Sequence, residues 1–392
     1  MSTPEDLFGD ALRARVDHTE QPRTPLTEVV STAHRIRRRR RIGTAAVSAV
    51  VLAVLATPFV LTAGDGPDSA PAPAEPAPSV PPADVRLADV ALGAPPSLAW
   101  LDGSDYVAAD GTRTTLPFDA VTRATPYAGG FLVTAFDDNQ VTLLDSQLRE
   151  VSQRCYAGSG FAVSDDGLRT AYPTSRCDRS EPTLHVGATS GDGDEWTAPM
   201  PLADAGPVGF LGDRVVVSSF NQGPPAVVGP DGSVTTLDAL GIATDVDEPR
   251  GLVAGRLAGD PSSEQVVPTG AVLDASTGTA RWSMPGWSLQ SFSPDGSLVL
   301  GARADAGGTS WAVFDSETGE QRHEFATPAG FGAFRVAWED DEHLLMVIVQ
   351  DRTEAIVRTT LDGAIERASD TAPYDEDGGQ DRRFGIAPHD FP

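Results

Sequence analysis

The sequence predicts an all-β fold, a seven-bladed β-propeller, preceded by a single transmembrane helix and a short helical cytoplasmic tail. Three observations support this prediction. A strand–turn–strand pattern recurs with a mean spacing of 42 residues, the length of a four-stranded propeller blade. Seven blades of 44 residues account for the 308 residues of 85–392. An uncharged stretch of 22 residues, 42–63, precedes this part of the chain.

Composition excludes several classes of function. Of 392 residues, 40% are hydrophobic, so the chain can bury a sizeable core. Acids outnumber bases 56 to 29, and a net charge of −27 argues against nucleic-acid binding, which needs a basic surface. All 29 bases are arginine, which excludes a Walker phosphate loop and any catalytic lysine. Arginine without lysine, with 39 Gly and 32 Pro, indicates a GC-rich bacterial genome.

Residues 1–41 are predicted to be a cytoplasmic tail with two short amphipathic helices. Thr3 and Thr24 each stand before a proline, the pattern of a helix N-cap followed by the first helical position. The apolar faces of the two helices include Leu7, Phe8, Leu12, Leu26, Val29 and Val30. These faces either lie on the membrane surface or bind a cytoplasmic protein.

The tail resembles those of membrane proteins of GC-rich bacteria that bind sigma factors, because it is short and ends in arginines before a single span. The resemblance implies a sigma-factor-like cytoplasmic partner. The tail lacks the H-x-x-x-C-x-x-C zinc signature of the best-known domain of that class.

Residues 42–63 are predicted to cross the membrane. As a helix they span about 33 Å, enough for the hydrocarbon core. Residues 35–41 upstream read RIRRRRR, whereas 64–84 downstream contain acids and no base, so the N-terminus is expected in the cytoplasm. The alternative is a cleaved signal peptide, whose apolar region is normally shorter. The Pro/Ala-rich residues 64–84 are expected to form a semi-rigid spacer.

Two classes of turn recur in residues 85–392. In the first, an aspartate begins the turn between two short strands. These aspartates are Asp110, Asp145, Asp192, Asp231, Asp274, Asp315 and Asp362. In the second, an inner strand leads through a tight turn into a buried strand, as in 161–172, 209–219, 290–302 and 336–348.

The motif FSPDGSLVLGA at 292–302 resembles TolB-like and WD-repeat-like propellers, although the Trp-Asp pair of true WD repeats is absent. Residues 97–116 supply only three strands for the first blade. The chain end, RRFGIAP at 382–388, reads like an inner strand, so we expect it to complete that blade and close the ring. Six or eight blades are the alternative counts.

Cys155 and Cys177 are the only cysteines. They lie on the predicted outer side of the membrane, 22 positions apart, and are predicted to form a disulfide. The alternative is two separate thiols. A redox pair would favour a C-x-x-C spacing, which is absent.

No catalytic, cofactor-binding or metal-binding set was found. The sequence contains no G-x-S-x-G and no zinc spacing, and its acidic clusters, such as Asp245, Asp247 and Glu248, do not follow a calcium loop. We interpret these clusters as solvated loops. Residues 271–282 resemble one blade repeat of pyrroloquinoline-quinone-type propellers, in which the tryptophan, here Trp282, packs between blades; a single copy does not imply the cofactor.

Two classes of function therefore stay open. The favoured hypothesis is a non-catalytic propeller that binds a protein, a peptide or a cell-wall sugar at its loop face or central channel. The alternative is an enzyme, a hydrolase or a quinone-dependent protein, with active groups collected from several blades. A deep channel lined by paired carboxylates or convergent arginines would favour the enzyme.

Overall fold

The computed structural model describes residues 85–119, 121–135, 141–154, 160–174, 182–202, 204–220, 223–259, 268–304, 309–328, 331–374 and 383–386. These residues belong to one compact unit, Pro71–Pro392. The predicted tail with its six apolar residues, the predicted span, the spacer and both cysteines lie outside the described residues, so those predictions stay predictions. Among the residues just given, no helix has the length and apolar character of a membrane span.

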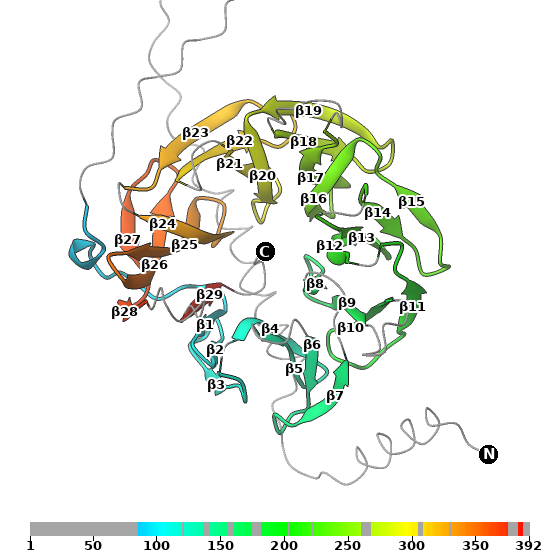
Figure 1. The fold of residues 1–392 in the computed structure, drawn as a ribbon, viewed down its shortest axis with the longest axis horizontal. Coiled ribbons are helices and arrows are strands. Elements are labelled where there is room, and N and C mark those ends of the chain that lie inside the picture. The colour runs from blue at the N-terminus through cyan, green and yellow to red at the C-terminus, as the bar shows by residue number, and fades with distance from the viewer. Residues whose placement is uncertain are drawn as a thin grey trace, which may run out of the picture. The chain divides into compact units, whose positions relative to one another are not determined.

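The described chain forms seven antiparallel sheets arranged around a centre, which confirms the seven-bladed propeller (Figure 1). Blade 1 contains β29 (Phe384–Ile386), β1 (Trp100–Asp102), β2 (Asp105–Val107) and β3 (Arg113–Thr115). Blade 2 contains β4 (Val121–Tyr127), β5 (Gly130–Ala135), β6 (Val141–Leu144) and β7 (Glu150–Arg154). Blade 3 contains β8 (Ala162–Val163), β9 (Arg169–Thr174), β10 (Thr183–Ala188) and β11 (Trp196–Pro199). Blade 4 contains β12 (Gly206–Leu211), β13 (Arg214–Ser218), β14 (Ala226–Val228) and β15 (Val234–Thr236).

The remaining blades follow the same order. Blade 5 contains β16 (Leu240–Asp247), β17 (Leu252–Leu257), β18 (Thr269–Asp274) and β19 (Thr279–Pro285). Blade 6 contains β20 (Trp287–Phe292), β21 (Leu298–Arg303), β22 (Ser310–Asp315) and β23 (Gln321–Ala326). Blade 7 contains β24 (Gly332–Trp338), β25 (His343–Gln350), β26 (Thr353–Thr360) and β27 (Ile365–Arg367), and the short β28 (Ala372–Pro373) pairs with β26. The first strand of each sheet faces the centre and the fourth lies at the rim, as β12 and β15 illustrate (Figure 1).

The seven turn aspartates all lie in hairpins, as predicted, and the structure shows that each hairpin joins the third and fourth strands of a blade. The reason is local. In blade 2, Asp145 Oδ1 accepts hydrogen bonds from the backbone N–H groups of Gln147 (2.8 Å) and Arg149 (3.0 Å). The side-chain hydrogen bond from Arg149, with these backbone bonds, lowers the pKa of Asp145 to about 2. An aspartate thus stabilises the turn whatever surrounds the blade.

The predicted closure of the ring by the chain end is confirmed. Strand β29 pairs antiparallel with β1, with Trp100 opposite Ile386 and Asp102 opposite Phe384. Phe384 and Ile386 are buried, and the Phe384 ring lies 5.9 Å from that of Trp100. The last described residues therefore supply the innermost strand of blade 1, and blade 1 has four strands like the others.

The core consists of apolar layers between adjacent blades. One layer joins blades 5 and 6 and includes Leu252, Leu289 and Phe314. Trp282, on the outermost strand of blade 5, lies against the same layer, and its indole N–H donates a 2.8 Å hydrogen bond to the carbonyl of Ser316 in blade 6. The prediction that this tryptophan packs between blades is confirmed.

The segment before β1 packs on blade 7. Its 3-10 helix η2 (Leu87–Asp89) buries Leu87, whose N–H donates a 2.6 Å hydrogen bond to Gln350 Oε1. Further along, Ser97 N–H donates to the buried Glu339, which is paired with Arg358. Residues 85–97 thus extend the contact between the two ends of the ring.

Candidate functional site

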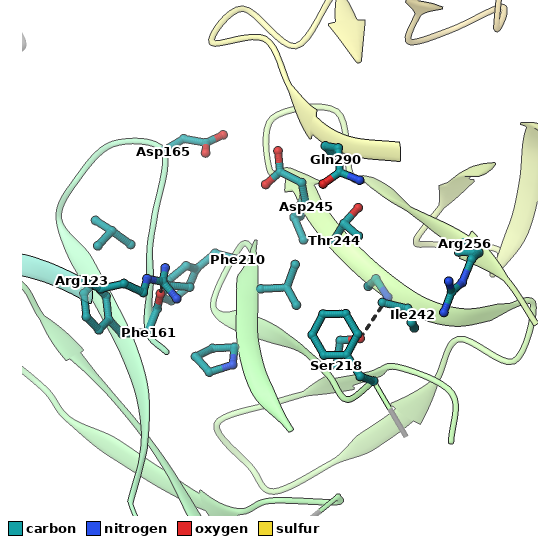
Figure 2. Close-up of a pocket in the computed structure, with 18 of the residues that line it drawn as sticks. Arg123, Phe161, Asp165, Phe210, Ser218, Ile242, Thr244, Asp245, Arg256 and Gln290 are labelled. Carbon is teal, nitrogen blue, oxygen red and sulfur yellow. Dashed lines mark hydrogen bonds between the residues drawn. The ribbon is translucent and has the colours of Figure 1, made fainter. Parts of the chain in front are cut away.

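The inner strands of blades 2 to 6 enclose a cavity with a volume of about 290 Å³. Its lining mixes charged, polar and aromatic side chains from segments far apart in the sequence (Figure 2). The residues that line it include Arg123, Phe161, Asp165, Phe210, Ser218, Phe220, Thr244, Asp245, Arg256, Ser288 and Gln290. A concave site with a few polar groups from several elements is the usual form of a ligand site.

Irregular pairing in the innermost strands brings polar groups to this cavity. In β16, Ala243 pairs with Gly255 and Asp245 with Ala254, so Thr244 is an extra residue of a β-bulge. A bulge changes the direction of the side chains that follow it. Thr244 and Asp245 are consecutive, yet both line the cavity. The Thr244 hydroxyl is buried and has no hydrogen-bond partner in the described structure.

The same bulge is stabilised from the neighbouring blade. The N–H of Ala243 donates a 3.0 Å hydrogen bond to the buried Ser218 Oγ at the end of β13, drawn as the dashed line in Figure 2. Similar irregularities lie in β4 beside Arg123 and in β20 around Gln290. The backbone of the inner strands therefore decides which polar side chains enter the cavity.

The carboxyl of Asp245 lines the cavity and is held by the neighbouring blade. Its Oδ2 accepts a 2.7 Å hydrogen bond from the N–H of Phe292 in blade 6. Burial, together with the negative charges of Asp165 and Asp247, raises the pKa of Asp245 to about 8, although this hydrogen bond opposes the shift. Asp245 is therefore largely protonated at neutral pH. Figure 2 shows the side chains of Asp165 and Asp245 directed toward one another.

An arginine and two phenylalanines form the opposite wall. Arg123 lies over the Phe161 ring at 4.8 Å and donates a 3.1 Å hydrogen bond to the Phe161 carbonyl. The guanidinium of Arg169 lies 4.7 Å from the Phe210 ring. These contacts hold the wall in place because a cation over an aromatic face is attracted to the ring quadrupole.

One end of the cavity lies where the inner strands begin. Ser288 is the second residue of β20, and Ile242, near the start of β16, pairs with Arg256 of β17. Phe220 follows the end of β13 and is 52% exposed. We call Ser218, Phe220, Arg256 and Ser288 the mouth group. This group lies at the end of the cavity where the inner strands begin, whereas the β8–β9 turn that carries Asp165 lies at the end where they finish.

The expected solvation of one acidic cluster is wrong. Asp247 is buried and paired with Arg250 Nη1 at 2.9 Å, and Asp245 lines the cavity, because both belong to the inner strand β16 and not to a loop. The sequence signal was present: two aspartates stand inside the β-type run LGIATDVD. Within the described ranges, no three His, Cys, Asp or Glu side chains are grouped to hold a metal ion.

None of the residues proposed from sequence as partner or disulfide sites lies in the described part of the chain. Sequence reasoning named the central channel as a possible binding region but proposed none of the residues that line the cavity as a site. These residues come from five blades and follow no spacing motif, so only the inner-strand aspartates could have drawn attention.

Comparisons with known proteins name no family. No family model matches the chain, and no curated protein matches it. Solved structures that resemble it include KlHsv2 with loop 6CD replaced by a Gly-Ser linker, at 13% identity and a TM-score of 0.45, covering 69% of this chain and 93% of that one. The Cps50 (Swd1) β-propeller domain of Myceliophteria thermophila matches at 11% identity and 0.44, covering 65% and 86%. BamB from Moraxella catarrhalis matches at 15% identity and 0.37, covering 65% and 88%. The function of this chain does not follow from these similarities.

Proposed function

We propose that the protein is a binding protein that displays its propeller outside a membrane and recognises a ligand at the central cavity. The observation that carries the binding function is the cavity itself, where charged, hydroxyl, amide and aromatic groups from blades 2 to 6 converge. A solvated loop face alone would not bring these groups together.

The experiment fills the cavity. Gln290 lines it from β20 and is half-buried, so Gln290→Trp should occupy the ligand volume. Native mass spectrometry of the full chain, purified after incubation with a small-molecule extract of the cell envelope, should detect a bound ligand on the wild type. The variant should lose it. Thr236→Trp, on the exposed outer strand β15, is the matched control and should retain it. Equal retention by both variants would contradict a binding role for the cavity.

Display outside the membrane rests on the sequence. Residues 42–63 are long and apolar enough to span, RIRRRRR precedes them and an acidic Pro/Ala-rich spacer follows. Protease added to intact cells should remove the propeller and spare the N-terminus. Protection of the propeller would contradict this orientation.

The tail is proposed to bind a cytoplasmic protein, which would couple it to events at the propeller. Support comes from the two apolar faces, which orientation in the membrane does not require, since the arginine run serves that purpose. Leu12→Asp with Val29→Asp should abolish crosslinking to a specific protein and leave membrane insertion unchanged. Crosslinking to lipid alone would favour a tail lying on the membrane surface.

A second candidate function is hydrolysis. The observation that favours it is that Asp165 and Asp245 line one cavity, since glycosidases use two carboxyl groups that flank the scissile bond. If the ligand identified above is a glycoside, the wild type should release its free sugar on prolonged incubation and Asp245→Asn should not. Recovery of the intact ligand from the wild type would leave the binding function as the better description.

A further inference from the structure

The mouth group contains an arginine, Arg256, whose guanidinium has no hydrogen-bond or ion-pair partner among the residues that the structure describes. Among the arginines whose side chains the structure describes, those with no hydrogen bond or ion pair to the guanidinium are Arg86, Arg214 and Arg256. The first two are exposed to solvent, whereas Arg256 is half-buried and lines the cavity. Two other half-buried arginines of the propeller do have acidic partners: Arg169 lies 2.5 Å from Glu248, and Arg358 contacts Glu339. A partly desolvated cation without a counter-ion favours an anion from outside the chain.

The mouth group also contains a second hydrogen-bond donor, the hydroxyl of Ser218. Ser218 Oγ already accepts the hydrogen bond from Ala243 N–H at 3.0 Å, so its own proton is available to another acceptor. Ser218 is buried, which fixes the position of this hydroxyl. Arg256 and Ser218 line the same cavity, and a guanidinium and a hydroxyl are both donors that a carboxylate accepts from.

Phe220 adds an apolar contact beside these donors. It is one of the few large hydrophobic side chains that are strongly exposed, at 52%, and it is the one that lines the cavity. An exposed aromatic ring at a polar mouth is typical of a ligand site. A ligand that reaches both Phe220 and Arg256 carries an apolar group next to its anionic group.

The charge of the chain selects among anions. The protein carries a net charge of −27, and a dianion such as a phosphate monoester would need more than one arginine to offset this field. Figure 2 shows Arg256 on the side of the cavity away from Arg123, so the two guanidinium groups do not form one cluster. A single negative charge is the better match.

We propose that the mouth group binds a small organic carboxylate, with its carboxylate on Arg256 and Ser218 and its apolar part on Phe220. This inference rests on the proposed binding function and names the ligand class of the same cavity.

The test uses the full chain and 4-fluorobenzoate as the probe, because this molecule carries one carboxylate on an apolar ring. Ligand-observed fluorine NMR should detect saturable binding in roughly the millimolar range expected for a ligand of this size. Arg256→Gln should weaken binding at least about tenfold, the usual scale for one lost charge-assisted hydrogen bond. Phe220→Ala should weaken it several-fold, and Arg256→Lys should retain part of it.

Two controls make the result specific. Arg214→Gln removes an exposed, unpaired arginine and should bind the probe like the wild type. The uncharged 4-fluorobenzyl alcohol should bind at least about tenfold more weakly than 4-fluorobenzoate, because it lacks the charge that Arg256 attracts. No binding of the benzoate, or equal binding to the wild type and Arg256→Gln with the fold verified by circular dichroism, overturns the proposal. In that case the cavity-filling test decides what remains. If the wild type binds a ligand from the envelope extract and Gln290→Trp does not, the binding function stands and only the assignment of a carboxylate ligand fails.

Discussion

Arg335 Nη1 donates a 2.8 Å hydrogen bond to the backbone carbonyl of Thr122, 213 positions earlier in the chain. Arg335 lies on the inner strand of blade 7 and Thr122 on that of blade 2, so the bond passes the inner strand of blade 1, β29. There, a Cβ on Gly385 would come within 3.1 Å of Arg335 Nη1. A glycine at this point of the closing strand therefore leaves room for a side chain that joins the two neighbouring blades.

The closing strand should contribute strongly to stability. Deletion of residues 384–392 removes the buried Phe384 and Ile386 and exposes the edge of β1, and should cost about 5 kcal/mol or more. Deletion of residues 387–392 keeps β29 and is the matched control. Urea unfolding should separate the two truncations clearly, and equal midpoints would contradict closure by β29.

Two equivalent turn glycines should differ in their tolerance of alanine. Gly278 and Gly319 occupy matching turns of blades 5 and 6, with φ of +67° and +73°. A Cβ at Gly278 meets nothing within 4 Å, whereas one at Gly319 would lie 2.6 Å from the Trp282 ring. Gly278→Ala should lower the free energy of unfolding by about 1 kcal/mol, because alanine is strained in the left-handed conformation of this position. Gly319→Ala should lower it by about 1–3 kcal/mol more, because the added Cβ also collides with the Trp282 ring. The difference between their unfolding free energies measures the packing of Trp282 on blade 6, and its absence would argue against that contact.

Asp245 should make stability depend on pH. Because the pKa is raised to about 8 in the folded protein, the folded state holds a proton that the unfolded state has released, and stability falls as pH rises from about 4 to about 8. Asp245→Asn is uncharged at every pH and keeps an acceptor for Phe292 N–H. The variant should match the wild type near pH 4 and melt several degrees higher at pH 8. Melting curves that stay parallel from pH 4 to 9 would show that Asp245 is not buried as a neutral acid.

The ion pair of Glu339 and Arg358 should hold the segment before β1 on blade 7. Burial raises the pKa of Glu339, but the hydrogen bonds from Arg358 and Ser97 N–H outweigh it, so the pKa lies below its usual value. The pair therefore stabilises the fold above about pH 4.5, and this contribution is lost as pH falls through the lowered pKa. Glu339→Gln should cost on the order of 3 kcal/mol at pH 7, because Arg358 then loses the buried one of its two acidic partners and keeps only the more exposed Glu366.

The control for this pair is an exposed one. Arg322 contacts Asp315 and Glu320 on the outer strand of blade 6, where solvent screens the charges. Arg322→Gln should leave the unfolding midpoint at pH 7 unchanged. A similar loss of stability in both variants would mean that burial is not what gives the Glu339 pair its strength.

Cys155 and Cys177 are predicted to form a disulfide. In sequence the first directly follows β7 and the second lies between β9 and β10. A loop of this size should stabilise the fold by roughly 3 kcal/mol. Maleimide labelling of the denatured full chain should find no thiol before reduction and two after it. Two reactive thiols without reduction would contradict the pairing.

The sequence by itself predicted seven blades and their order, with six or eight as alternatives, and the structure decided for seven. Asp145 and its six counterparts mark the hairpins because the hydrogen bonds of an aspartate turn are made within a few residues, so their position does not depend on the rest of the fold. Closure by Phe384–Ile386 was also predictable, since a three-stranded first blade leaves one strand missing and the chain end matches it.

Only the tertiary structure decided what the cavity contains. Asp245 and Asp247 appear in the sequence only as an acidic cluster. In the structure, the bulge at Thr244 and the packing of β16 beside β20 place Asp245 in the cavity and bury Asp247. Arg256 and Phe220 meet the same cavity from two blades, although no spacing links them. Turn hydrogen bonds are local and therefore leave a pattern in the sequence. The environment of an inner-strand side chain depends on strand irregularities and on neighbouring blades, and therefore leaves none.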